Sequence, residues 1–194
     1  MLDGQKSTWQ LQTWLDGKSG LKLSMKKSEW RQKFLEAVAN CCEEGREAVD
    51  YIYTRKINVS MKRTRKSVGA FWTLAKSAHL NSVHYNSESS LVSPNAWALL
   101  IHEVRHLQQG MLTAFSIYGE LDAWQYQFQV LKKITGTTLS PLAEEILTLP
   151  LTMERKNLQR ARQLMTQLAG KGYGANLLPL YPIQLEIKYW FARK

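Results

Sequence analysis

The sequence has little cysteine and no long apolar stretch, and each scarcity excludes a class of protein. Its 194 residues contain two cysteines, Cys41 and Cys42, whose adjacency rules out an ordinary disulfide framework and any CxxC motif. No run approaches the roughly 18 apolar residues of a transmembrane helix, and residues 1–6 carry no apolar signal region. With 44% hydrophobic and 22% charged residues, the composition is that of a folded rather than a disordered chain. We therefore expect a reduced, soluble, cytoplasmic protein.

Acidic residues are also scarce relative to basic ones, 16 against 26, which leaves a net charge of +10. The excess is uneven, because residues 1–66 carry +6 and residues 137–194 carry +4, whereas residues 67–136 are neutral. The segment Arg55–Lys66 holds six basic residues and no acidic one. Such a run is typical of a surface that contacts an anionic partner such as nucleic acid, and it is equally typical of a solvated strand face.

Apolar spacing and turn residues predict an α+β chain with three strands among its helices. Alternating apolar residues predict a strand over 57–61, and the glycine that follows predicts a hairpin turn near 66–69 into a second strand over 70–73. A third strand is expected within 79–85. The predicted helices cover about 28–53, 93–110, 117–134, 142–148 and 152–169, and residues 183–192 form either a strand or a helix.

These elements are expected to form one compact domain in three parts. Residues 1–27 are an irregular lead-in, residues 28–136 are the core, and residues 137–194 are a mostly helical extension. The apolar face of the first helix places Cys41 and Cys42 in the core. The extension contains a basic amphipathic helix that we expect to pack on the core, the alternatives being that it binds a partner or covers a cleft.

The predicted helix over 93–110 contains the motif His102-Glu103-Val104-Arg105-His106, an HExxH sequence. Histidines at i and i+4 lie about 40° apart on a helix, so that both imidazoles can reach one metal ion. Glu103, about 100° from His102, is placed to bind a water on that metal. Two histidines, one further protein ligand and a water make up the usual catalytic zinc site. The alternative is a pair of core histidines that bond to other side chains.

The third ligand must come from outside this helix. The remaining histidines, His79 and His84, both precede the motif, and Gln109 stands where a metzincin has a glycine. In the next predicted helix, Glu120 lies at the inward edge of the apolar stripe and Asp122 on the opposite, solvent side. That stripe consists of Ile117, Leu121, Trp124, Phe128 and Leu131. Glu120 is therefore the predicted third ligand and Asp122 the alternative, unless Glu120 only complements the helix dipole.

An HExxH helix followed by a helix that bears a glutamate resembles the gluzincin type of zincin-like metallopeptidases. The resemblance covers about residues 28–136 and includes the order of a helix, two or three strands, the HExxH helix and the glutamate helix. It implies a zincin-like core with a small antiparallel or mixed sheet. It also implies Zn²⁺ as the cofactor, His102, His106 and Glu120 as its ligands, and Glu103 as the general base.

Two details refine the resemblance. The sequence Glu120-Leu121-Asp122-Ala123 is similar to the Glu-x-x-Ala signature of several small gluzincin families. Many gluzincins place an aspartate four residues after the ligand glutamate, where it supports a histidine ligand. Trp124 stands at that position here, so the support of the histidines is left open.

The expected function is a zinc-dependent metallopeptidase that cleaves a peptide or protein substrate with a metal-bound water activated by Glu103. The substrate would bind as an added strand along Ala70–Thr73, unless that segment is a hairpin packed on the core. The alternatives are a nucleic-acid-associated basic zincin-like protein and a non-catalytic zincin fold. Candidates for the group that stabilises the oxyanion are Tyr118, Tyr126, His84 and Arg105.

Overall fold

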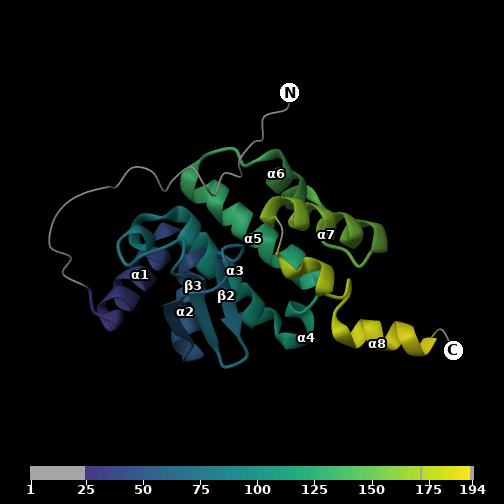
Figure 1. Ribbon diagram of the computed structural model, residues 1–194, viewed down its shortest axis with the longest axis horizontal. Helices are drawn as coiled ribbons and strands as arrows, with labels where there is room; N and C mark the ends of the chain where they lie inside the picture. Colours follow the sequence, from purple (N-terminus) through teal and green to yellow (C-terminus); the bar gives the residue numbers. More distant parts are fainter. Residues whose placement is uncertain (1–24, 171, 193–194) are drawn as a thin grey trace.

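The computed structural model describes residues 25–170 and 172–192, so most of the lead-in predicted over residues 1–27 lies outside the described residues. The predicted mixture of helices with a small mixed sheet is confirmed (Figure 1). The elements are α1 (Lys27–Cys41), α2 (Glu43–Thr54), β1 (Asn58–Lys62), β2 (Ala70–Thr73), β3 (Ser77–Asn81), η2 (Ser89–Val92), α3 (Pro94–Gln109), α4 (Met111–Ala114), α5 (Ile117–Thr135), α6 (Pro141–Thr148), α7 (Arg155–Ala169), η3 (Gly174–Leu177) and α8 (Ile183–Ala192).

The single helix predicted over 28–53 is wrong, because the chain breaks at Cys42 into α1 and α2. Cys42 has extended dihedral angles (φ −171°, ψ 175°), and its Sγ accepts a hydrogen bond from the Gly45 N–H at 3.4 Å, which caps α2. The two helices then pack on each other so closely that a Cβ at Gly45 would lie 2.1 Å from the Val38 carbonyl oxygen. Cys41 and Cys42 are half-buried at the edge of the core rather than inside it. One extended residue leaves the apolar spacing almost unchanged, so periodicity does not detect it.

The strands are joined in a different order from the predicted one. The central strand is β3, which pairs with β1 in parallel and with β2 antiparallel, so the hairpin expected between the first two strands is wrong. The tight turn instead joins β2 to β3, with Lys76 at φ +52°. All five residues of β3 are buried, as a central strand requires. Among the described strands, β2 is an edge of the sheet, as the sequence predicts.

The connection from β1 to β2 crosses the end of β3, where the buried Asn81 holds it. The Asn81 Oδ1 accepts a hydrogen bond from the Thr64 N–H at 3.1 Å, and its Nδ2 donates to the carbonyls of Arg65 and Val68 at 2.8 and 2.6 Å. A buried amide is costly without partners, and the loop carbonyls supply them. The loop therefore has a defined path over the sheet.

Two hydrophobic clusters meet at α3 and α5, the helices that separate α1, α2 and the sheet from α6 and α7 in Figure 1. The first contains α1, α2, the sheet and α3, including the fully buried Phe34 and Leu100. In the second, Leu121 of α5 packs with Ile146 of α6 and Leu164 of α7, so the C-terminal extension shares a core with the glutamate helix. The last segment, α8, is helical. None of the helices in the described ranges combines the length and the apolar character needed to cross a bilayer.

Candidate metal centre

The HExxH helix has the ends that its sequence predicts. The Ser93 hydroxyl accepts a hydrogen bond from the Ala96 N–H at 3.3 Å, Pro94 occupies the first turn, and the helix ends at Gly110, whose φ is +77°. Buried apolar residues surround α3 on nearly every side, so that the predicted passage through the core is confirmed. His102, Glu103 and His106 are consequently 6%, 5% and 2% exposed.

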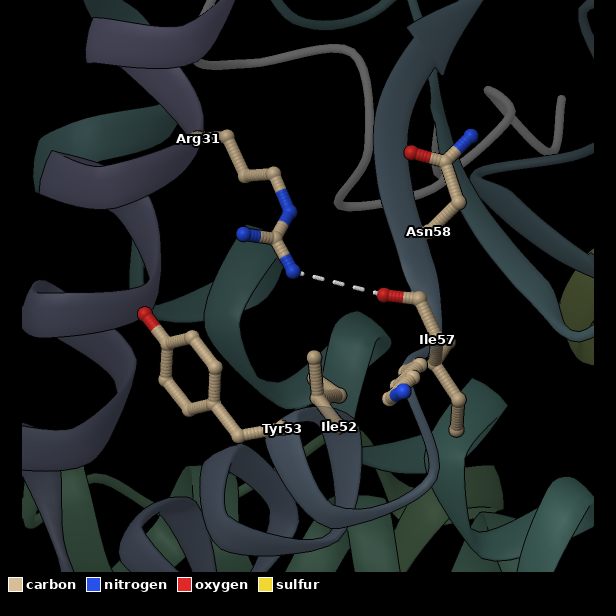
Figure 2. Close-up of a pocket in the computed structure, with 6 residues that line it drawn as sticks. Arg31, Ile52, Tyr53, Ile57 and Asn58 are labelled. Carbon is tan, nitrogen blue, oxygen red and sulfur yellow. Dashed lines mark hydrogen bonds between the residues drawn. The ribbon is translucent and has the colours of Figure 1, made fainter.

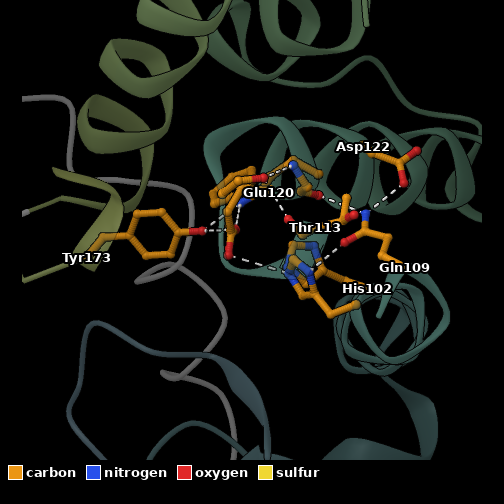
Figure 3. A network of polar contacts seen from close by, with 10 residues as sticks. His102, Gln109, Thr113, Glu120, Asp122 and Tyr173 are labelled. Carbon is orange, nitrogen blue, oxygen red and sulfur yellow. Dashed lines mark hydrogen bonds and ion pairs between the residues drawn. The ribbon is translucent and has the colours of Figure 1, made fainter. Parts of the chain in front are cut away.

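Three possible metal ligands converge between α3 and α5 (Figure 3). The Nε2 atoms of His102 and His106 lie 3.0 Å apart, and the Glu120 Oε1 lies 3.5 Å from the His106 Nε2. All three ligand atoms are within 4.8 Å of one another. Two ligands of one zinc ion, each at about 2.0–2.1 Å, lie roughly 3.3 Å apart, close to the separation of these nitrogens. The helical wheel that turns Glu120 inward therefore agrees with its position.

The position of Glu120 depends on how α5 begins. The Ser116 Oγ accepts a hydrogen bond from the Gly119 N–H at 3.0 Å and donates one to the Thr113 carbonyl at 2.6 Å. Gly119 lies so close to the preceding segment that a Cβ there would be 2.2 Å from the Thr113 carbonyl oxygen. The short helix α4 thus turns the chain back tightly, which places the first turn of α5, with Glu120, beside α3.

Charge at the site also fits a bound cation. Burial, followed by the charge of Glu120, raises the pKa of the Glu103 carboxyl well above its ordinary value. A hydrogen bond from the backbone of Trp72 lowers this pKa by a smaller amount. Within the described ranges, no lysine or arginine forms an ion pair with Glu103 or Glu120. Burial, followed by His106, lowers the pKa of His102 well below its ordinary value and keeps the ring neutral, which is the metal-binding form. Two nitrogens and a carboxylate oxygen are a donor set that zinc accepts.

A chain of hydrogen bonds orients His106 from the side opposite the other ligands. Its Nδ1 lies 3.1 Å from the Gln109 Oε1, and the Gln109 Nε2 donates to the Gly119 carbonyl at 2.8 Å and to the Asp122 Oδ2 at 2.6 Å. Arg105 donates to both oxygens of Asp122, at 2.8 and 3.1 Å. Asp122, the alternative third ligand, is therefore not on the solvent-facing side that the helical wheel predicts, and Glu120 rather than Asp122 lies with the two histidines. The Asp122 side chain is only 15% exposed and supports Gln109 instead.

His102 has a different environment. Its Nδ1 is buried and makes no hydrogen bond of standard geometry within the described structure. The Ala123 carbonyl and the Gln127 side chain nevertheless lie near enough to raise its pKa. Burial and the charge of His106 lower the pKa by more, so the net shift is downward. Trp124 packs edge-on to His102, with ring centroids 6.2 Å apart. The position at which many gluzincins carry an aspartate therefore contributes packing to His102 rather than a carboxylate.

Tyr173 is a residue of the site that the sequence does not reveal. It precedes η3 in the C-terminal extension, and its hydroxyl donates to the Glu120 Oε2 at 2.5 Å (Figure 3). The Trp124 Nε1 donates to the Tyr173 hydroxyl at 2.7 Å and to the same Glu120 oxygen at 3.2 Å. Burial, followed by the charge of Glu120, raises the pKa of Tyr173 well above its ordinary value, so it remains a donor. These contacts leave the Glu120 Oε1 directed at His106.

A cavity of about 400 Å³ opens beside these groups. His102, Glu103, Trp124 and Tyr173 line it together with the apolar side chain of Leu99. The edge strand β2 runs along the site, because Ala70 lines the cavity and the Trp72 ring lies 6.0 Å from the His106 ring. A polypeptide added to β2 would therefore pass Glu103.

The candidates for oxyanion stabilisation lie in different places. His84 lines the cavity, where its Nε2 donates to the Lys66 carbonyl at 2.7 Å. Arg105 is paired with Asp122 and stacks on the ring of Tyr126, 5.2 Å away, and the Tyr126 hydroxyl reaches Glu47 at 3.4 Å. Tyr118 packs against the second hydrophobic cluster. Of the four, only His84 is among the residues that line the cavity.

A second hollow, of about 370 Å³, lies between α1, α2 and β1 (Figure 2). Arg31 lines this hollow, and its guanidinium group donates to the Ile57 carbonyl at 3.3 Å. The Arg31 Cζ lies over the Tyr53 ring, 5.6 Å from the ring centroid. The hollow contains no carboxylate or imidazole among its lining residues, so it offers no comparable chemistry.

The comparisons with known proteins find no relative of this chain. No protein-family model matches the chain, and searches of curated proteins and of solved structures find no significant match. The case for a function therefore depends on the site itself.

Proposed function

We propose that this protein is a zinc-dependent metallopeptidase of gluzincin type. The observation that carries the proposal is the meeting of the Glu120 Oε1 with the Nε2 atoms of His102 and His106, directly beside Glu103. The four residues come from two helices, and Glu103 lines a cavity large enough for a substrate side chain. Three protein ligands leave a coordination position open, as in catalytic rather than structural zinc sites.

Each residue has a distinct task in peptide hydrolysis. A zinc ion in this site would polarise the scissile carbonyl and lower the pKa of water. The Glu103 carboxylate accepts a proton from the attacking water and later delivers it to the leaving amine. The edge of β2 hydrogen-bonds the substrate backbone and brings the scissile bond to Glu103. Gln109 and Tyr173 hold His106 and Glu120 in fixed orientations.

Metal content is the first test. Protein purified without added zinc, and measured by plasma mass spectrometry, should hold about one equivalent of zinc, which His102→Ala removes. The Glu103→Gln variant should keep the metal and lose peptide hydrolysis, because Glu103 acts on water rather than on the metal. Wild-type protein that holds less than about a tenth of an equivalent of any transition metal, unaffected by His102→Ala, contradicts the proposal.

The coordination of the metal separates this proposal from a non-catalytic zinc site. X-ray absorption of the zinc-loaded protein should give two histidine nitrogens, one carboxylate and at least one water oxygen. Four protein ligands and no water would instead favour a structural metal, and the wild type would then hydrolyse peptides no better than the Glu103→Gln variant.

A further inference from the structure

We propose that the cavity beside Glu103 binds a peptide carrying a bulky apolar side chain and, within a few residues of it, a carboxylate that contacts Lys66. This inference rests on the proposed function and names the class of substrate. It arises from the contrast between the apolar wall of the cavity and the basic chain segment that leads to it.

The wall of the cavity is apolar. Val68, Val83, Leu99 and Ala169 line it, and the aromatic ring of Tyr85 adds to the same surface. A volume of about 400 Å³ accommodates one large aliphatic or aromatic side chain with part of the adjoining backbone. Removing such a side chain from water supplies binding free energy that an alanine cannot supply.

The chain segment that leads to the cavity is basic. Lys66 lines the cavity, and Lys62, Arg63 and Arg65 precede Lys66 on β1 and in the β1–β2 connection. All four side chains are exposed. In the described part of the chain, none of the four lies within 4.0 Å of a carboxylate. Their charge is therefore available to an external partner. These four residues account for much of the net charge of +6 in residues 1–66.

The loop that carries Lys66 is held rather than free. Asn81 anchors it by hydrogen bonds to the carbonyls of Arg65 and Val68, and His84 donates to the carbonyl of Lys66 itself. A Cβ at Gly172 would lie 3.0 Å from the Ser67 Oγ, so the C-terminal extension also abuts the loop. These contacts set the position of the Lys66 backbone relative to the cavity.

Strand geometry connects the two features. A peptide paired with β2 passes Trp72 and Ala70 and then approaches Gly69 and Lys66, because the chain from Lys66 to Ala70 lines the cavity and leads directly into β2. A carboxylate on the substrate therefore reaches Lys66 from the side of the scissile bond that faces Ala70. An acidic side chain and a free C-terminal carboxylate present the same group, and the experiment must distinguish them.

Peptide binding to the zinc-loaded Glu103→Gln variant tests this inference without requiring catalysis. Four fluorescein-labelled peptides are compared by anisotropy: one with phenylalanine and a nearby glutamate, its glutamine analogue, its alanine-for-phenylalanine analogue, and the glutamine analogue with an amidated in place of a free C-terminus. We expect phenylalanine to improve affinity about tenfold or more over alanine. Glutamate, or else the free C-terminus, should improve it about threefold to fivefold, as exposed ion pairs do.

Charge-reversal variants then assign the effect to one residue. Lys66→Glu should remove or reverse the preference for the carboxylate. Lys56→Glu, the same change at a lysine that lines the second hollow, should leave this preference intact. Equal binding of the glutamate and glutamine peptides together with equal binding of the free and amidated termini overturns the inference.

Nucleic acid is the competing partner. If a DNA oligonucleotide binds the same loop, displaces the peptide, and loses affinity on Lys66→Glu, the basic segment is a polyanion surface and the inference fails. The proposed function fails separately, when the wild-type protein lacks zinc or cleaves none of these peptides although the variant binds them.

Discussion

Gln109 holds His106 by the ring nitrogen that faces away from the other ligands, with 3.1 Å between the Gln109 Oε1 and the His106 Nδ1. The Gln109 Nε2 donates to the Gly119 carbonyl and to Asp122, which identifies the other end of the amide as its oxygen. An oxygen acceptor requires that Nδ1 carry the proton, so Nε2 keeps a lone pair for a metal. The orientation of one ligand is thereby linked to the helix that supplies another.

Removing this acceptor should weaken metal binding without altering the ligands. Gln109→Met keeps the length of the side chain but cannot accept the hydrogen bond from His106. We expect the zinc affinity, measured by competition with a chromogenic chelator, to fall about 10- to 100-fold. Gln108→Met is the matched control, because Gln108 is exposed on the same helix. An unchanged affinity in Gln109→Met would show that the tautomer of His106 is set by something else.

Two neighbouring acids should respond differently to loss of charge. Glu120→Gln replaces the anionic carboxylate with a neutral amide, whose oxygen is a weak zinc ligand, and should lower zinc affinity by about 100-fold or more, because the site then has two strong donors. Asp122→Asn leaves the three ligands in place and disturbs only Gln109 and Arg105, so the loss should be about tenfold or less. The opposite order of the two affinities would assign the third ligand to Asp122.

The contribution of Tyr173 can be measured by removing one oxygen atom. In Tyr173→Phe the Glu120 Oε2 keeps only its longer hydrogen bond, 3.2 Å from the Trp124 Nε1, so the carboxylate is less well oriented. We expect zinc affinity to fall about tenfold. The visible spectrum of the Co²⁺-substituted protein should also change, since it reports the geometry of the ligands. Tyr53→Phe, at an exposed tyrosine, should change neither quantity.

The break between α1 and α2 predicts an unusual response to alanine. Gly45 lies inside α2, where Gly→Ala ordinarily stabilises a helix by up to about 1 kcal/mol. Because the new Cβ would meet the Val38 carbonyl, Gly45→Ala should instead lower the free energy of unfolding by about 1–3 kcal/mol. Denaturation in urea measures the change. Gly174→Ala, where nothing lies within 4 Å of a new Cβ, should remain near the wild type.

Much of the candidate site is local and could be predicted. The ends of α3 follow from Ser93 and Gly110, and those of α5 agree with the predicted helix 117–134 to within about one residue. Once both helices exist, the spacing of His102 and His106 and the inward position of Glu120 follow from 3.6 residues per turn. The sheet order was mispredicted because neighbouring strands in sequence often pair, whereas here β3 inserts between the other two.

The sequence by itself determined which residues share a helical face, since a turn of helix depends on residues three or four positions apart. The sequence therefore indicated the two histidines and Glu120 as candidate metal ligands, and Glu103 as the residue that would act on a metal-bound water. Only the tertiary structure decided how those helices are held together: that Asp122 supports His106 through Gln109, and that Tyr173 contacts Glu120 from 53 residues away. The physical reason is that these contacts depend on how separate helices and loops pack, and no periodicity along the chain records such packing.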